Sequence, residues 1–248
     1  NVYAMDPIDG SMTALTESTN NAHRAVSWFP ADDRVLFARD QGGDELDHVY
    51  VLEIDGEVLD LTPGEDLKAQ FTGWSDSGGH FFVLSNERDA KAMDLYRYQT
   101  DNYTRELIFE NDGSWFVAGG SRDERFLVLL KAISNASTRL YLLDLEAEDT
   151  TPVLITPAEG DVSHTAFTFT PDDKYFIYGT DRHGEFVSAW QYEIATGEHT
   201  PYFTAEWDTS GISFSKSGKF QNTTTNEDGR FVVALTSLVS GTAIDLSA

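Results

Sequence analysis

The sequence contains no cysteine among its 248 residues. Disulfide bridges, a thiolate nucleophile and cysteine-ligated zinc are therefore excluded. No apolar run approaches the roughly 18 residues that a membrane-spanning helix requires. Positive charge is also scarce, because 17 Lys and Arg stand against 42 Asp and Glu and give a formal net charge of −25. Such a surface repels phosphate groups, so we expect neither nucleic acid nor a membrane as a partner.

The composition is nevertheless that of a folded protein, with 40% hydrophobic and 12% aromatic residues. This apolar fraction is large enough to build a core and excludes a disordered acidic tail. The sequence begins at Asn1 without a signal peptide. Because cysteine usage gives no information on redox compartment, both a periplasmic and a cytoplasmic bacterial location remain open.

One phrase recurs five times along the chain. It consists of an aromatic residue or glycine pair, a short polar turn, a basic residue or His, and then a run of apolar residues. The last polar residue before each apolar run is Arg34, His80, Arg125, Lys174 and Lys219. The spacings between these positions are 46, 45, 49 and 45 residues. A nearly constant period of this length indicates a repeat protein.

A second phrase alternates with the first and reads as two strands joined by a turn. The turns include Asp-Gly and Thr-Gly pairs, and glycine accepts the positive φ that tight hairpins require. One aromatic position is shared by the copies and is occupied by Tyr3, Tyr50, Tyr96, Tyr141 and Trp190.

Together the two phrases describe four short strands per unit, with no convincing amphipathic helix. Four strands in about 40–50 residues are typical of a β-propeller blade. We therefore predict an all-β fold, a single β-propeller domain over residues 1–248. The expected units are a half blade at 1–16 and full blades at 22–62, 68–109, 113–155, 162–203 and 208–246.

The half blade lacks its two inner strands, so we expect an incomplete propeller that can associate with itself through open strand edges. The aromatic residues of both phrases are expected to form the cores of the blades. These core residues are the five of the shared position together with Trp28, Trp74, Phe169 and Phe214.

Several phrases resemble the N-terminal propeller of the prolyl oligopeptidase family of serine peptidases. They are WSDSGGHFFVLSNERD at 74–89 with DLYRYQTDNYTRELIF at 94–109, and FTPDDKYFIYGTDRHGEF at 169–186 with AWQYEIATGE at 189–198. The acylaminoacyl-peptidase and dipeptidyl-peptidase-like branch is the most similar, and TolB-like propellers share the same turn pattern. The resemblance implies that the catalytic Ser, Asp and His belong to a separate α/β-hydrolase domain.

A serine nucleophile of that fold needs a G-x-S-x-G elbow, and this sequence has none. We therefore expect no catalytic residue, cofactor or metal in this chain, and no enzymatic activity of its own. The resemblance implies a propeller that gates and orients oligopeptides, with the missing hydrolase domain or another protein as its partner. A TolB-like module that binds a protein or ligand is the alternative, and a metal-using propeller lyase is a third possibility.

Two histidines occupy equivalent places near the start of an innermost strand. His23 stands five residues before Trp28, and His164 stands five before Phe169. Such positions can line a central channel, where imidazoles could bind a metal or a substrate carboxylate. The third equivalent residue is Ala69, which argues against a ring of ligands.

The loops between the second and third strands carry many charges. Arg39, Arg88 and Arg182 recur there in similar places, and His183 follows the last of them. The resemblance implies that such loops can face the substrate and receive a chain terminus. The alternative is that each arginine pairs with a neighbouring Asp or Glu and only stabilises its loop.

Overall fold

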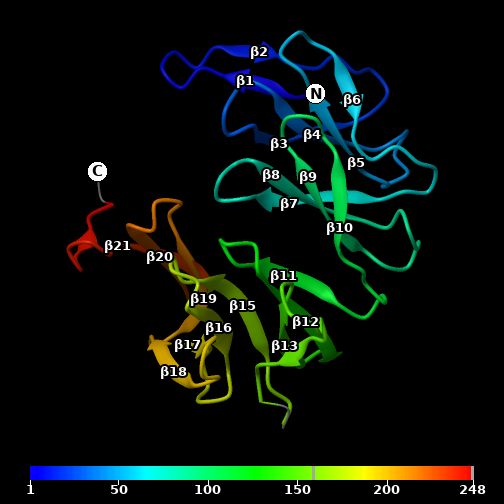
Figure 1. Ribbon diagram of the computed structural model, residues 1–248. Helices are drawn as coiled ribbons and strands as arrows, with labels where there is room; N and C mark the ends of the chain where they lie inside the picture. The colour runs from blue at the N-terminus through cyan, green and yellow to red at the C-terminus, as the bar shows by residue number, and fades with distance from the viewer. Residues whose placement is uncertain (158–159, 247–248) are drawn as a thin grey trace. The chain divides into compact units, whose positions relative to one another are not determined.

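The computed structural model describes residues 1–157 and 160–246, and every regular element within these ranges is a β-strand (Figure 1). These residues include no helix that could span a membrane. The chain divides into two compact units, Asn1–Ser114 and Trp115–Ala248. Whether both units form one domain stays a prediction.

The first unit contains a two-stranded sheet and two four-stranded sheets, all antiparallel and ordered along the chain. The N-terminal hairpin consists of β1 (Tyr3–Met5) and β2 (Met12–Ala14). Blade 1 consists of β3 (His23–Trp28), β4 (Val35–Arg39), β5 (His48–Leu52) and β6 (Val58–Asp60). Blade 2 consists of β7 (Ala69–Trp74), β8 (His80–Ser85), β9 (Asp94–Gln99) and β10 (Arg105–Phe109).

The second unit contains three further four-stranded antiparallel sheets with the same strand order. Blade 3 consists of β11 (Phe116–Gly120), β12 (Phe126–Ser134), β13 (Ser137–Asp144) and β14 (Val153–Leu154). Blade 4 consists of β15 (His164–Phe169), β16 (Tyr175–Thr180), β17 (Ser188–Glu193) and β18 (His199–Phe203). Blade 5 consists of β19 (Asp208–Phe214), β20 (Phe220–Glu227), β21 (Arg230–Ser237) and β22 (Ala243–Ile244). The expected all-β fold of five full blades and one half blade is confirmed for the described residues.

The turn between the first and second strands is closed by the same backbone hydrogen bond in every blade. Its acceptors are the carbonyl oxygens of Arg34, His80, Phe126, Tyr175 and Phe220, at donor distances of 2.8–3.0 Å. In the last three blades these residues lie one position after Arg125, Lys174 and Lys219. Aligning the repeats by their last polar residue is therefore wrong by one residue in these three blades. The polar side chain stands where the turn is exposed to solvent, and this position is not tied to the strand register.

The shared aromatic position has a clear place in the register. In blades 1 to 4 its residue lies opposite the third or fourth residue of the second strand. The pairs are Tyr50 with Phe37, Tyr96 with Val83, Tyr141 with Leu129, and Trp190 with Tyr178. In a pleated strand, alternate residues face one side of the sheet. Within each unit these aromatic side chains pack against the preceding sheet, as Tyr50 does with Val2, Tyr96 with the blade 1 cluster and Trp190 with the cluster that contains Phe126.

In three sheets, a threonine that follows the last strand accepts a hydrogen bond from the strand before it or, in the hairpin, from the residue just before β1. The Thr62 hydroxyl accepts a hydrogen bond from the backbone N–H of Val49 at 3.0 Å. The Thr16 hydroxyl accepts from Val2 at 2.9 Å, and the Thr156 hydroxyl accepts from Leu140 at 3.0 Å. Since these threonines are buried, each bond satisfies a backbone donor that water cannot reach.

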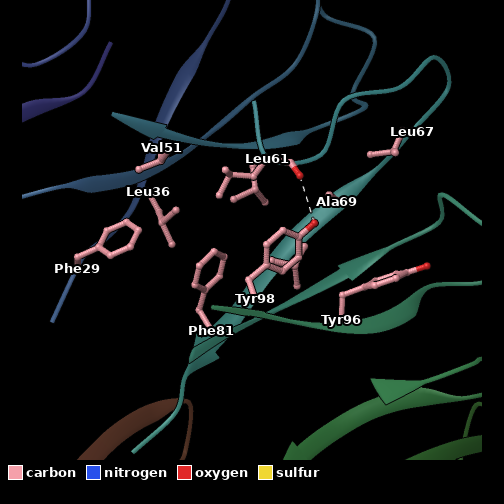
Figure 2. Packing of buried hydrophobic residues seen from close by; sticks show 11 residues of the cluster. Phe29, Leu36, Val51, Leu61, Leu67, Ala69, Phe81, Tyr96 and Tyr98 are labelled. Atoms are coloured by element: carbon pink, nitrogen blue, oxygen red, sulfur yellow. Dashed lines mark hydrogen bonds between the residues drawn. The ribbon is translucent and has the colours of Figure 1, made fainter. Parts of the chain in front are cut away.

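Blades 1 and 2 share the largest apolar cluster of the first unit (Figure 2). Leu36 and Val51 of blade 1 pack with Phe81 and Tyr98 of blade 2, and all four are almost fully buried. The Tyr98 hydroxyl donates a hydrogen bond to the carbonyl oxygen of Leu61 at 3.2 Å, which Figure 2 shows as a dashed line. The aromatic ring therefore contributes apolar area to the core while its polar end is satisfied.

For two residues, the prediction that they lie in the blade cores is wrong. Trp28 is 50% exposed and Tyr3 is 54% exposed. The equivalent Trp74 lies opposite Phe81, packs on Phe29 and donates its indole N–H to the Ser27 hydroxyl of blade 1 at 2.8 Å. Trp28 and Tyr3 face the side where a preceding sheet would lie, and the described residues provide no inner strands there to cover them.

Candidate functional site

His23 and Arg39 lie directly opposite each other where β3 begins and β4 ends. The His23 ring packs on Phe37 with 5.1 Å between ring centroids. Its Nδ1 atom is buried and has no hydrogen-bond partner among the described residues. Burial, followed by the positive charge of Arg39, lowers the pKa of His23, so the neutral imidazole is favoured.

The Arg39 guanidinium rests on an aromatic ring instead of a carboxylate. Its Cζ atom lies 4.1 Å from the centroid of the Tyr50 ring, and one terminal N–H donates to the Tyr50 hydroxyl at 2.8 Å. The Nε atom is buried without an acceptor among residues 1–157 and 160–246. This cationic group thus keeps unused donors, and such donors suit a carboxylate.

His164 occupies the equivalent place in blade 4, opposite Thr180 where β16 ends. It is only 2% exposed, and neither ring nitrogen has a partner in the described part of the chain. Its ring meets Tyr178 edge to face, with centroids 6.0 Å apart. Burial lowers the pKa of His164 to about 4, so the ring is neutral at pH 7.

Arg182 and His183 follow β16 and lie in the electrostatic environment of His164. His183 stacks on Trp190 with 4.0 Å between centroids and an interplanar angle of 21°. The Arg182 side chain is exposed. The fold therefore brings three of the predicted site residues together in blade 4 and two, His23 and Arg39, together in blade 1.

Arg88 belongs to neither group. It forms an ion pair with Asp94 at 2.7 Å, and one terminal N–H donates to the carbonyl oxygen of Asn111 at 2.6 Å. Asp94 is fully buried and also accepts from the backbone N–H of Asn111. Arg88 therefore pairs with a neighbouring carboxylate and stabilises its own loop, which was the alternative role expected for these arginines.

Nine of the eleven arginines separate into two classes by their partners. Seven of them pair with a carboxylate: Arg24, Arg34, Arg88, Arg97, Arg105, Arg125 and Arg230. Arg39 and Arg182 have no carboxylate partner among the described residues. This is unusual in a chain with 42 acidic residues, because a nearby carboxylate is easy to find. These two cations are therefore available to a ligand.

Two polar pairs near these clusters were missed in the sequence. The buried His48 lies 2.9 Å from Asp60 through its Nδ1, and His199 lies 2.8 Å from the Tyr178 hydroxyl through its Nδ1. Their partners stand on other strands, 12 and 21 residues away, so no local motif marks them.

The side chains of these two clusters are of types that can bind a ligand. No group of three or more His, Asp or Glu within the described ranges is arranged to hold a metal ion. Neutral imidazoles, unpaired guanidinium groups and aromatic surfaces can bind a carboxylate or a peptide group.

Comparisons with known proteins agree with this fold. Residues 22–175 match the family model described as the N-terminal β-propeller domain of prolyl oligopeptidase. Dipeptidyl aminopeptidase BIII of Pseudoxanthomonas mexicana is 35% identical over 108 residues, which cover 43% of this chain and 15% of that protein.

Two solved structures have similar folds at low sequence identity. A puromycin-hydrolyzing peptidase of Mycobacterium tuberculosis superposes with a TM-score of 0.68 and 11% identity, over 97% of this chain and 41% of that chain. TolB of Acinetobacter baumannii superposes with a TM-score of 0.57 and 14% identity, over 90% of this chain and 68% of that one. The family match, together with the four-stranded blades, shows that this chain belongs to the prolyl oligopeptidase family, as its N-terminal β-propeller domain.

Proposed function

We propose that this chain is the non-catalytic propeller of a serine peptidase, and that it selects and orients oligopeptides for a hydrolase domain outside these 248 residues. Family membership supports the peptidase context. The lack of a G-x-S-x-G elbow supports the division of labour, because the propeller has no serine nucleophile of its own.

The observation that carries the proposal is the availability of Arg39 and Arg182 to a ligand. Arg39 stands at the end of β4, opposite His23, and Arg182 stands two residues after Thr180, which lies opposite His164. A guanidinium group with free N–H donors binds a carboxylate through charge-assisted hydrogen bonds. An oligopeptide has such a group at its C-terminus, so these clusters would hold the chain end away from the scissile bond.

Binding of short peptides to the 248-residue chain tests this role by isothermal titration calorimetry. We expect a peptide with a free C-terminal carboxylate to bind more tightly than the same peptide with a C-terminal amide. Arg39→Gln should reduce the affinity for the free acid about tenfold, which corresponds to about 1.4 kcal/mol, and should leave the amide unaffected. Arg24→Gln is the matched control, since Arg24 already pairs with Asp47.

Equal binding of acid and amide would contradict the proposed orientation of the peptide. A separate measurement addresses catalysis: aminoacyl-nitroanilide substrates should not be hydrolysed by this chain alone. Turnover that is sensitive to a serine-directed inhibitor would contradict the non-catalytic assignment. The coding sequence after Ala248 gives an independent test, because the proposal requires a G-x-S-x-G elbow followed by Asp and His.

A further inference from the structure

Blade 4 and blade 5 meet at a pair of aromatic rings. Phe186 lies in the loop between β16 and β17, and Trp207 comes directly before β19. Their ring centroids are 5.6 Å apart at an interplanar angle of 47°. The next residues along the chain are joined, because the backbone N–H of Val187 donates to Asp208 Oδ1 and the backbone N–H of Thr209 donates to the carbonyl oxygen of Val187, both at 2.8 Å. The rings therefore have a defined place between two neighbouring blades.

The Trp207 ring is accessible although the blades on both sides of it are present. It is 38% exposed, whereas Phe186 is partly buried. The indole N–H of Trp207 has no acceptor among the described residues. An enclosed tryptophan normally finds such an acceptor, as Trp74 does in the Ser27 hydroxyl. Trp207 thus presents both an aromatic face and a free donor to a ligand.

Cationic side chains of this protein already lie over several of its aromatic rings. In the same unit, Lys131 Nζ lies 4.8 Å from the centroid of the Trp115 ring. Neither Phe186 nor Trp207 has a cation over its ring in the part of the chain that the structure describes. The face of a tryptophan ring attracts a cation through its quadrupole, more strongly than that of tyrosine or phenylalanine. The chemistry of the pair therefore suits a cation that comes from outside the chain.

Two carboxylates flank the ring pair in the sequence. Glu185 precedes Phe186 and Glu206 precedes Trp207, and both glutamate side chains are exposed. Neither has an ion-pair partner within the described ranges. Unpaired carboxylates next to the rings attract a positive ligand, and the net charge of −25 adds attraction at longer range. Charge therefore favours the same kind of ligand as the ring faces do.

The same loop also carries a positive group. Arg182 stands four residues before Phe186 and, as noted above, has no carboxylate partner among the described residues. The loop thus offers one group for a carboxylate and one for a cation. A ligand that carries both charges satisfies the loop better than a ligand that carries only one of them.

We propose that Trp207 and Phe186 bind the ammonium or guanidinium group of a basic side chain in an oligopeptide. The cation would lie on the Trp207 ring, close to Glu185 and Glu206, and the indole N–H would donate to a carbonyl oxygen of the peptide. The preferred substrates would then be oligopeptides with a Lys or Arg residue and a free C-terminal carboxylate. This choice of substrate rests on the proposed peptide-selecting role, whereas recognition of the cation by the rings does not.

Proton–nitrogen correlation NMR of the tryptophan indole groups tests the site with ligands that have no carboxylate. The probes are Nα-acetyl-lysine amide and the uncharged Nα-acetyl-norleucine amide. We expect the lysine derivative to shift the Trp207 signal, which is identified by its absence in Trp207→Leu. It should bind about fivefold more tightly than the norleucine derivative. Glu206→Gln should reduce this preference, and Glu148→Gln, which removes the same charge at an exposed position between β13 and β14, should not.

Isothermal titration calorimetry extends the test to peptides that differ only in having Lys or norleucine at one position. Trp207→Leu should remove the preference of about fivefold for the Lys peptide. Trp207→Phe should keep part of it, because a phenylalanine ring also attracts a cation. Trp28→Leu is the matched control, since Trp28 is 50% exposed at the end of β3, and it should keep the full preference. Circular dichroism confirms that each variant is folded.

The outcomes separate this site from the proposed orientation of the peptide. Equal binding of the lysine and norleucine derivatives would overturn the site, and so would an equal loss of preference in Trp28→Leu and Trp207→Leu. A peptide that binds better as the free acid, but equally well with Lys or norleucine, would reject the cation site alone. A preference for lysine with equal binding of acid and amide would reject the orientation and keep the cation site.

Discussion

The buried His164 predicts that the second unit loses stability between pH 7 and pH 5. The ring is 2% exposed, neither nitrogen has a partner among the described residues, and its pKa is lowered from 6.5 to about 4. The unfolded chain therefore binds a proton more readily than the folded chain within this window. The stabilisation is complete above pH 6.5 and is lost as the pH falls toward 4.

The groups around the ring determine how far the pKa falls. Burial is the largest cause, the carboxylate of Asp181 opposes it, and the cationic Arg182 adds to it. His183 and His199 act in the same direction as Arg182. With folded and unfolded pKa values of about 4 and 6.5, the free energy of unfolding should drop by about 2 kcal/mol between pH 7 and pH 5 through this residue alone.

Urea unfolding followed by tryptophan fluorescence at pH 7, 6 and 5 measures this effect. His164→Leu should remove about 2 kcal/mol of the pH dependence, because the variant has no group to protonate. At pH 7 it should be at least as stable as the unchanged protein, since no hydrogen bond of the ring is lost. His183→Leu is the control, because His183 is exposed and stacked on Trp190, and its variant should keep most of the pH dependence, since burial is the largest cause of the lowered pKa of His164. The same pH dependence in His164→Leu as in the unchanged chain would refute the reasoning.

Three further predictions concern stability and are measured by the same urea titrations at pH 7. Thr62→Val should cost about 1–3 kcal/mol, since it keeps the shape of the side chain but leaves a buried backbone N–H without its acceptor; an unchanged midpoint would show that the bond is dispensable. Arg88→Gln should cost about 3–5 kcal/mol because it leaves the fully buried Asp94 carboxylate without its counter-ion, and Asp94→Asn should cost less, since Arg88 is partly exposed and keeps Glu110 at 3.4 Å; an equal cost of the two changes would contradict this reasoning. Phe81→Ala should cost about 3–5 kcal/mol in the buried cluster, whereas Phe116→Ala at an exposed position should change stability by less than about 0.5 kcal/mol; equal losses would contradict the assigned core.

The fold could be predicted from the sequence because every blade has the same local pattern of polar turns and apolar runs. The apolar run after each polar turn marks a second strand, as at Val35 and Phe126. The period of about 45 residues then requires that the units repeat. The strand register could be predicted less well. The turn hydrogen bond is accepted by Phe126 and Tyr175, whereas the sequence pattern pointed to Arg125 and Lys174, one residue earlier.

The candidate site was only partly accessible. The equivalence of His23 and His164 could be found, because both stand at a fixed distance before an aromatic residue. The difference between Arg39 and Arg88 could not, since all the loops contain acids nearby. Arg88 reaches Asp94, whereas Arg39 lies on the ring of Tyr50, and that choice depends on side-chain direction across strands.

Local patterns in the sequence specify the kind of unit. Two-residue alternation, polar turns and their spacing are enough to predict four-stranded blades, because strand formation depends on local alternation. Which faces are covered was decided only in three dimensions. Trp28 and Trp74 occupy the same place in the repeat, yet the first is half exposed and the second donates a hydrogen bond to the neighbouring blade. The burial of a side chain depends on whether another sheet packs against it. The residues next to it in the sequence do not carry that information.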